Sequence, residues 1–311
     1  MAAMRRPLSL LTALCLGGAA LLLPAAASAQ YVGEREARPL TGVLKRIKDA
    51  GVVRIGYRQA AIPFSYEGAG GRPHGYAIDL CHELVDEIAE AAGIAMLIVQ
   101  YRRVTPADRI AQVVDGSIEL ECGATTNNAE RRRQVAFSPL TFVAGTRLLV
   151  KSGSPVRSAR DLPGRKVAVV RGTTNEAAMR HLATTLAPGA TVVVADDYAQ
   201  ALVMIAAGEV DAFAGDDILL TAFIAERGLQ RQYAVVGELL SREPYGIMFA
   251  RDDAPLAQAV DTAFRRLAAS RELRLIYDRW FLRPLPSGIR LGLPMSAELR
   301  RSFEALGLPP E

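Results

Sequence analysis

Two successive runs of alternating strands and helices constrain the fold of this chain most strongly. The first run predicts strand, helix, strand, helix and strand at residues 52–56, 77–92, 96–101, 105–115 and 118–120. This order is typical of a parallel sheet covered by helices, because each helix carries the chain back to the start of the next strand. The sequence therefore predicts one α/β unit that extends to about Ala144.

A second α/β unit is predicted from about Ser152 to Leu240, after a Gly-, Ser- and Pro-containing segment typical of a hinge. A further strand at 245–250 and a helix pair at 254–281 then return the chain to the first unit. Two crossings predict two lobes joined by a hinge. The expected parts are a leader at 1–29, lobe 1 at 30–145 and 246–283, lobe 2 at 146–245, and a C-terminal tail at 284–311 that packs on the surface.

The first 29 residues have the pattern of a secretory signal peptide. Arg5 and Arg6 precede an apolar run at 8–23, and Ala27-Ser28-Ala29 supplies a cleavage site. The apolar run is too short for a membrane anchor. We therefore expect cleavage after Ala29 and a soluble, exported protein.

Charge and cysteine content narrow the partners of this exported chain. Loss of Arg5 and Arg6 lowers the formal net charge from +4 to +2, which is too weak for nucleic-acid binding. Cys81 and Cys122 remain, and a lone pair of cysteines in an oxidising compartment forms either a disulfide, which we expect, or two buried thiols. Neither cysteine has a metal-ligand partner at the required spacing, so no metal or other cofactor is expected.

Residues 121–133, ECGATTNNAERRR, have the composition of a carboxylate-binding turn. Small residues let a ligand approach the backbone, and the N–H groups at the start of a following helical turn favour an anion. Arg131 can hold a carboxylate through two parallel hydrogen bonds. The three arginines alone would fit a solvated helix start, but the whole stretch predicts a binding site.

Three further positions are candidates for the same site. Arg58 follows the first strand, and ligands of open α/β sheets bind beyond the carboxyl ends of strands. The turn at 172–176 is either an anion site or an ordinary helix cap, and Thr173 with Glu176 predicts a capping box. Asp216 ends a predicted strand, where it can pair with a ligand ammonium or cap the next helix.

Eight segments in this order resemble those of a known family: GYRQAAIPFSY, GYAIDLC, ECGATTNNAERR, FVAGTRLLV, LPGRKVAVVRGTTNE, DAFAGDD, EPYGIMFARDD and DRWF. The chain is similar, from about Leu40 to Leu282, to the periplasmic solute-binding proteins of amino-acid ABC transporters, the bacterial solute-binding protein family 3, and most to the glutamate/aspartate-binding type. The resemblance implies an α/β Venus-flytrap fold, with two mixed sheets and covering helices joined by a two-strand hinge. It also implies a periplasmic monomer without catalytic activity, which delivers one amino acid to a membrane permease.

The resemblance also assigns ligand contacts. Arg131 is expected to hold the α-carboxylate, and Thr125, Thr126, Thr173 and Thr174 are expected to add donors around it. Asp216 is expected to contact the ligand's ammonium. Arg58 and Arg109 are expected to contact its side-chain carboxylate. Tyr198 completes the expected set.

Three positions depart from the glutamate/aspartate pattern. Ala124 and Pro106 stand where close members of the family have serine, and Tyr198 stands where they have histidine. These departures concern the choice among glutamate, aspartate and their amides rather than the class of ligand.

The charges of the predicted site favour an acidic ligand. A desolvated amino acid with two carboxylates needs about three cationic partners, since an unpaired buried charge costs several kcal/mol. Alternatives are a glutamine- or asparagine-binding protein, and an enzyme of the cyclohexadienyl or arogenate dehydratase kind on the same fold. His74, His82 and His181 lie in no matching catalytic motif, which disfavours the enzyme. A sensory or murein-associated domain of a larger protein is disfavoured because the chain ends soon after the fold.

Overall fold

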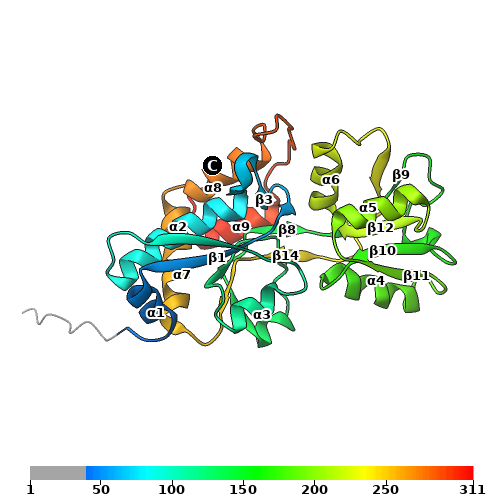
Figure 1. The fold of residues 1–311 in the computed structure, drawn as a ribbon. Helices are drawn as coiled ribbons and strands as arrows, with labels where there is room; N and C mark the ends of the chain where they lie inside the picture. Colours follow the sequence, from blue (N-terminus) through cyan, green and yellow to red (C-terminus); the bar gives the residue numbers. More distant parts are fainter. Residues whose placement is uncertain (1–39, 311) are drawn as a thin grey trace, which may run out of the picture. The chain divides into compact units, whose positions relative to one another are not determined.

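The computed structural model describes residues 40–310 of the chain. The predicted signal peptide and its cleavage site lie outside these residues. The described part contains two five-stranded sheets, each covered by helices (Figure 1). No helix within residues 40–310 has both the length and the apolar character needed to cross a membrane.

The first sheet has the strand order β5-β1-β6-β15-β7. In chain order its strands are β1 (Val52–Tyr57), β5 (Ile98–Arg103), β6 (Leu120–Glu121), β7 (Val135–Phe137) and β15 (Met248–Ala250). β1 is parallel to β5 and β6, whereas β15 is antiparallel to β6 and β7. A late segment of the chain therefore lies inside the sheet that the early segments build.

The second sheet repeats this arrangement in the order β11-β10-β12-β9-β13. Its strands β9 to β13 are Thr146–Lys151, Lys166–Val170, Thr191–Ala195, Ala212–Asp216 and Tyr233–Val236. β10 is parallel to β11 and β12, and β9 is antiparallel to β12 and β13. Two mixed sheets of the same topology confirm the predicted fold class. We call the part around the first sheet lobe 1 and the part around the second lobe 2.

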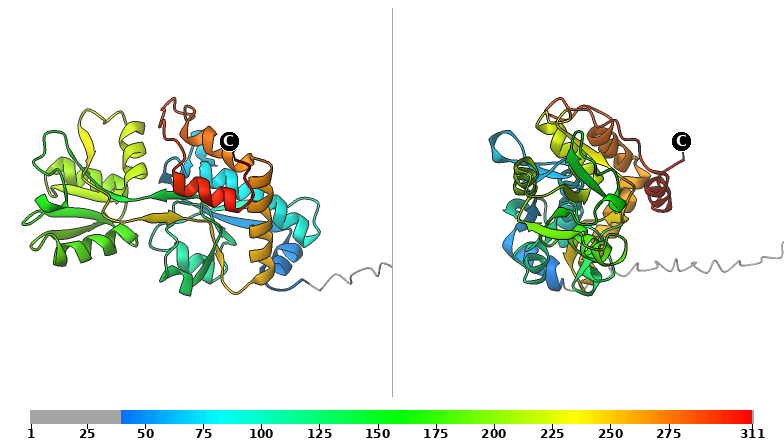
Figure 2. Two further views of the ribbon diagram at one scale, coloured as in Figure 1. Left: turned by 180° about the vertical axis from the view of Figure 1, so that it is seen from behind. Right: turned by 90° about the vertical axis from the view of Figure 1, so that its right-hand side faces the viewer.

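A pair of short antiparallel strands connects the two lobes. β8 (Phe142–Ala144) precedes β9, and β14 (Glu243–Tyr245) precedes β15; Tyr245 pairs with Phe142. Figures 1 and 2 show both strands running between the lobes. The predicted single strand at 245–250 is wrong, because Tyr245 pairs in this hinge while Met248 pairs in the sheet of lobe 1.

Helices cover the sheets of both lobes. The helices of lobe 1 are α1 (Gly42–Ala50), α2 (Tyr76–Ala92), α3 (Arg109–Val114), α7 (Ala254–Ala269), α8 (Glu272–Phe281) and α9 (Ala297–Ala305). In lobe 2 they are α4, α5 and α6 at Thr174–Thr185, Tyr198–Ala207 and Asp217–Glu226. α3 is shorter than predicted, because Thr105 and Asp108 bond each other's backbone in a turn before it begins.

Short elements complete the described chain. Three 3₁₀ turns, η1 to η3, lie at Ala69–Gly71, Arg131–Arg133 and Ala159–Asp161. A small sheet is formed by β2 (Ala60–Ala61), β3 (Ser65–Glu67) and β4 (Pro73–His74). The tail beyond residue 283 carries α9, which contacts the hinge strand β8.

Aromatic packing anchors the hinge on lobe 1. The Phe64 ring lies 5.0 Å from Phe142 and 5.1 Å from Tyr245, one residue on each hinge strand. Phe281 of α8 stacks on Phe142 at 5.0 Å. Such ring pairs add about 0.5–1.5 kcal/mol each beyond the area that they bury. The lobe 1 ends of both hinge strands are therefore fixed, and any hinge bending is expected nearer lobe 2.

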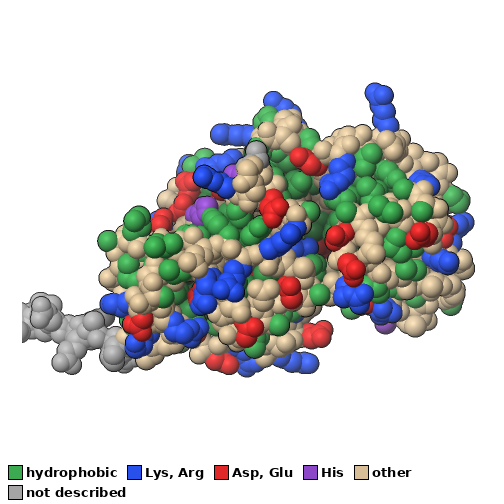
Figure 3. Space-filling model, in the orientation of Figure 1, with side chains coloured by type: hydrophobic (Ala, Val, Ile, Leu, Met, Phe, Trp, Pro, Cys, Tyr) green, Lys and Arg blue, Asp and Glu red, His purple; other side chains and the backbone are tan. Residues whose placement is uncertain are grey.

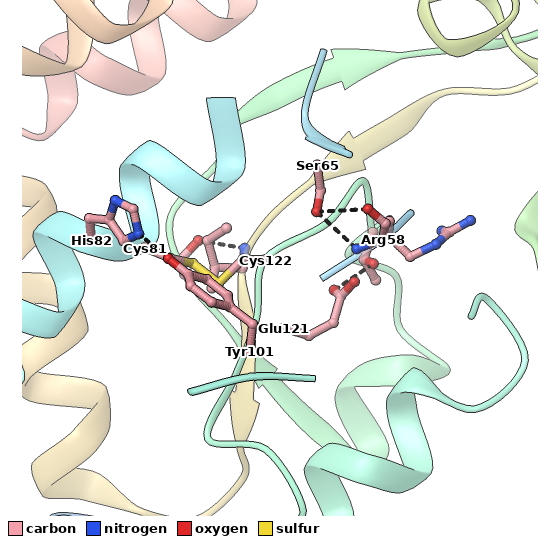
Figure 4. Close-up of a disulfide and its surroundings, with 10 residues drawn as sticks. Arg58, Ser65, Cys81, His82, Tyr101, Glu121 and Cys122 are labelled. Carbon is pink, nitrogen blue, oxygen red and sulfur yellow. Dashed lines mark hydrogen bonds between the residues drawn. A yellow bond between two sulfur atoms is a disulfide. The ribbon is translucent and has the colours of Figure 1, made fainter. Parts of the chain in front are cut away.

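A disulfide joins Cys81 of α2 to Cys122 just after β6, as predicted (Figure 4). It closes a loop with a sequence separation of 41. Cys122 lies at the start of the turn that was predicted to bind a carboxylate, so the bridge holds that turn against α2.

Removal of this disulfide is expected to lower the free energy of unfolding by about 2–4 kcal/mol, because the unfolded chain regains the entropy of an open loop. Urea titration of the Cys81→Ser/Cys122→Ser variant measures this loss. A reducing agent should lower the midpoint of the wild type and leave that of the double variant unchanged. Equal midpoints for reduced and oxidised wild type would contradict the bridge.

Candidate functional site

A narrow pocket lies between the carboxyl ends of the parallel strands of the two lobes. Its lining residues come from both lobes: Arg58, Arg109, Ala124, Thr126, Thr173, Thr174, Asn175, Tyr198, Asp216 and Leu219. β1, β6 and β12 end at this pocket, and α4 begins there. The structure thus brings together most of the side chains that the sequence predicted, at the edge where ligands of α/β sheets bind. Larger hollows occur elsewhere on the described surface, but none of those characterised gathers arginines and a buried carboxylate in this way.

Arg131 lies at the start of η2 and is almost completely buried. Its Nη1 donates to the Thr126 carbonyl at 2.9 Å, and its Nη2 reaches the Gly172 carbonyl of lobe 2 at 3.4 Å. Burial, with the neighbouring Arg109 charge, lowers the pKa of Arg131 to about 10. The guanidinium therefore stays protonated at neutral pH and is held rigidly next to the pocket.

Arg58 and Arg109 contribute two further guanidinium groups from lobe 1. Nη1 of Arg109 donates to the Ala124 carbonyl at 3.2 Å, but its buried Nε has no hydrogen-bond partner among the described residues. Burial and the Arg109 charge lower the pKa of Arg58 to about 10. Buried donors are rarely left unpaired. The unpaired Nε and the repulsion between the two cations both indicate that an anion belongs here.

Glu121 is a buried carboxylate that the sequence analysis did not select. Its Oε2 accepts a hydrogen bond from the Thr125 hydroxyl at 2.7 Å, and its Oε1 has no partner among the described residues. Thr125 is fully buried and is not among the residues that line the pocket. Figure 4 shows Glu121 beside Arg58, whose guanidinium points away from the disulfide.

Asp216 places one carboxylate in the pocket from the end of β12. It accepts hydrogen bonds from Asn175 at 2.8 Å and from the Tyr245 hydroxyl. Burial raises the pKa of Asp216 to about 6, although both hydrogen bonds act in the opposite direction. Its side chain makes no capping bond to α6, so the alternative role of a helix cap is wrong.

The turn before α4 brings lobe 2 close to lobe 1. The Thr173 hydroxyl accepts from the Glu176 N–H at 3.2 Å and donates to the Val170 carbonyl at 2.6 Å. The predicted capping box is only half formed, because the Glu176 carboxylate accepts from the N–H of Gly172 instead of that of Thr173. The single hydroxyl proton of Thr173 is therefore already used within lobe 2.

Gly172 is required by its position in this turn. Its φ is +73°, and a Cβ there would lie 2.8 Å from both the Ala107 Cα and the Pro106 carbonyl oxygen of lobe 1. A larger residue would strain the left-handed backbone and would also prevent this approach of the two lobes. Pro106, one of the three departures noted in the sequence, thus lies where the lobes meet.

Tyr198 begins α5 and is buried between two rings. Its ring makes edge contacts with Phe213 at 4.9 Å and Phe223 at 5.5 Å. Burial raises the pKa of Tyr198, so its hydroxyl is neutral. The wall of the pocket at this point is an aromatic ring with a neutral polar tip.

Glu243 of the hinge, which was not predicted from the sequence, contacts two of the residues that line the pocket. Its carboxylate accepts hydrogen bonds from the hydroxyls of Thr126 and Thr174, each at 2.6 Å. Glu121 and Glu243 bring the buried carboxylates around the pocket to three, against three arginines. Within residues 40–310, neither carboxylate is within ion-pair distance of those arginines. Both oxygens of Glu243 and Oε2 of Glu121 accept from hydroxyl groups, whereas Oε1 of Glu121 has no partner among the described residues.

The surface drawn in Figure 3 shows no second cluster of charge comparable to that of the interlobe pocket. On the face drawn in Figure 3, basic and acidic side chains alternate without a large patch of one sign. No group of three or more metal-ligating side chains occurs within residues 40–310. The concentration of buried charge at the interlobe pocket is therefore the main chemical feature of the described chain.

Two lobes of equal topology, a two-strand hinge and a charged pocket between them define a hinged ligand-binding protein. Residues 53–283 match the bacterial extracellular solute-binding proteins, family 3, and the chain belongs to this family. The predicted family is thereby confirmed.

Relatives with curated names agree with this assignment. The chain is 39% identical to the L-glutamate/L-aspartate-binding protein of Pseudomonas aeruginosa over 84% of this chain and 87% of the relative. It is 31% identical to the glutamate/aspartate import solute-binding protein of Escherichia coli over 91% and 94% of the two chains. Among solved structures, it is similar to an ancestral amino acid-binding protein described as a precursor of cyclohexadienyl dehydratase, with a TM-score of 0.66, 26% identity and coverage of 77% and 99%.

Burial of the Asp216 carboxylate is expected to lower the free energy of unfolding when the group is ionised. Its pKa in the folded protein, about 6, lies above the ordinary value of 3.8, so ionisation favours unfolding. Stability should fall as the pH rises from about 4 to about 6, by about 3 kcal/mol for this group. Asp216→Asn should therefore be more stable than the ligand-free wild type at pH 7 by about 1–3 kcal/mol, with the difference lost at pH 4. Urea titrations at both pH values measure it, and a difference that does not change with pH would contradict the assignment.

Proposed function

We propose that this protein is exported to the periplasm, captures an acidic amino acid in the interlobe pocket and delivers it to the permease of an ABC transporter. The observation that carries this proposal is a set of three guanidinium groups around the pocket that also holds the buried carboxylate of Asp216. Arg109 and Arg131 are buried, Arg58 is partly buried, and none of the three forms an ion pair within residues 40–310. Charges buried in this way are expected to be compensated when the ligand is bound.

A dicarboxylic amino acid fits these groups one by one. Its α-carboxylate would lie on Arg131 and the N-terminus of α4, where free N–H groups favour an anion. Its ammonium would lie on Asp216, and its side-chain carboxylate on Arg58 and Arg109. An amide ligand such as glutamine or asparagine would leave Arg58 and Arg109 without an anionic partner, so we place it second.

The cellular location, the partners and the movement of the lobes follow from the same proposal. The predicted leader, cleaved after Ala29, would export the chain as a monomer without a cofactor. Lobe 1, at 30–145 and 246–283, and lobe 2, at 146–245, would close on the ligand by a shift toward the liganded population. The names of the relatives from Pseudomonas and Escherichia support the acidic amino acid as ligand and import as the process.

A dehydratase on the same fold is the second candidate, and two observations favour it. The chain is similar to a structure described as a precursor of such an enzyme. Asp216, with a pKa raised to about 6 by burial, has the proton affinity of a general acid. Turnover of prephenate or arogenate by the purified protein would support it.

Calorimetry with the twenty amino acids tests the proposed specificity. We expect binding of L-glutamate or L-aspartate and much weaker binding of their amides. Binding of a neutral or basic amino acid without binding of either acid would overturn the proposal.

Arg58→Met should weaken the binding of L-glutamate by about 30-fold or more, because loss of one member of a desolvated charge pair costs about 2–5 kcal/mol. Its effect on L-glutamine should be smaller, since the amide carries no charge at that point. Arg102→Met, at an exposed position of β5, is the matched control and should bind as the wild type does. Equal losses for glutamate and glutamine would contradict the role of Arg58.

A further inference from the structure

Glu243 is a buried carboxylate on the hinge strand β14 that contacts both lobes. It is 3% exposed. Its Oε2 accepts from Thr126, which follows β6 in lobe 1, and from Thr174, the first residue of α4 in lobe 2. Its Oε1 accepts from Ser241 of the same segment. One carboxylate thus holds a side chain of each lobe from a position between them.

The two threonine bonds to Glu243 exist together only while the lobes are in contact. The hydroxyl oxygens of Thr126 and Thr174 lie 3.3 Å apart. Thr126 is also fixed to the hinge by a β-bridge to Tyr245, so its bond to Glu243 is local to lobe 1 and the hinge. The bond from Thr174 would break if lobe 2 moved away. Hydrogen bonds to a charged group are stronger than those between neutral groups, so loss of one shifts the equilibrium between open and closed lobes toward the open form.

The same bonds decide what the threonines offer to a ligand. A hydroxyl has one proton to donate and two lone pairs. Both threonine protons point at Glu243 in hydrogen bonds of 2.6 Å. Each hydroxyl therefore presents lone pairs to the pocket, which suit the ammonium of an amino acid and not its carboxylate. The expected role of Thr126 and Thr174 as carboxylate donors changes accordingly.

Other contacts of the same region fit a latch between lobes. Arg131 of lobe 1 donates to the Gly172 carbonyl in the turn before α4 of lobe 2, two residues before Thr174. Gly172 itself lies against Pro106 and Ala107 of lobe 1. Glu243 thus lies in a region where residues of the two lobes are in contact.

We propose that Glu243 is a positioning residue with two roles: it latches the lobes by sharing its carboxylate between Thr126 and Thr174, and it turns both hydroxyls into acceptors for the ligand's ammonium. The second role rests on the proposed function, since it requires an amino acid in the pocket. The first does not, because its hydrogen bonds join residues of the chain alone. The two roles can therefore be tested separately.

The latch is tested on the ligand-free full-length mature protein by small-angle X-ray scattering. Glu243→Gln keeps the shape of the side chain and removes its charge, and Glu238→Gln, at an exposed position nearby, is the matched control. We expect a larger radius of gyration for Glu243→Gln than for the control and the wild type. Thr174→Val, which removes only the bond from lobe 2, should give a similar increase. An unchanged radius in both variants would overturn the latch, whatever the ligand of the protein is.

Calorimetry tests the coupling and the orientation of the hydroxyls. Glu243→Gln should weaken L-glutamate binding by roughly 10- to 100-fold, as expected for loss of one or two charged hydrogen bonds. Adding Thr174→Val to it should cost little more, because the shared bond is already lost. Additive losses for the two substitutions would overturn the coupling.

The ammonium contact is isolated with glutarate, which has both carboxylates of glutamate and no amino group. The loss caused by Glu243→Gln should be clearly smaller for glutarate than for L-glutamate. Equal losses for the two ligands would overturn the assignment of the hydroxyl lone pairs to the ammonium. Absence of binding of either acid to the wild type would overturn the proposed function and leave the scattering test of the latch intact.

Discussion

Burial of like charges without ion-pair partners is the constraint on which the rest of this structure depends. Arg58, Arg109 and Arg131 lose much of their hydration at one pocket, and burial together with mutual repulsion lowers the pKa values of Arg58 and Arg131. Backbone carbonyl groups and nearby carboxylates compensate part of the free-energy cost of removing these charges from water. The remainder is free energy that an anionic ligand can recover on binding.

The scaffold keeps this arrangement from relaxing. The Cys81–Cys122 disulfide and the aromatic contacts of Phe64 hold the carboxylate turn and the hinge strands against lobe 1. Lobe 2 supplies the opposite charge through Asp216, which is bonded to the hinge by Tyr245. Binding energy and lobe contact are therefore coupled through the hinge rather than through the pocket alone.

Much of this organisation could be predicted from the sequence because it is local. The alternation of strands and helices gives two sheets. Residues at or directly after the carboxyl ends of strands, such as Asp216 and Arg58, are therefore expected at the ligand-binding edge. The hydrogen bond from Thr125 to Glu121 could not be predicted, because neighbouring residues in extended chain face opposite sides and only the structure shows which side each takes. Glu121 and Glu243 were missed for a related reason. Their importance comes from contacts such as that between Thr126 and Glu243, which are 117 residues apart in the chain.

The central claim is that an acidic amino acid neutralises the three guanidinium groups between the lobes. A crystal structure of the mature protein grown with L-glutamate tests this most directly. The account predicts one glutamate in the pocket, with its two carboxylates on the arginines and its ammonium on Asp216. An empty pocket at saturating glutamate, or a glutamate whose side-chain carboxylate contacts neither Arg58 nor Arg109, would contradict it.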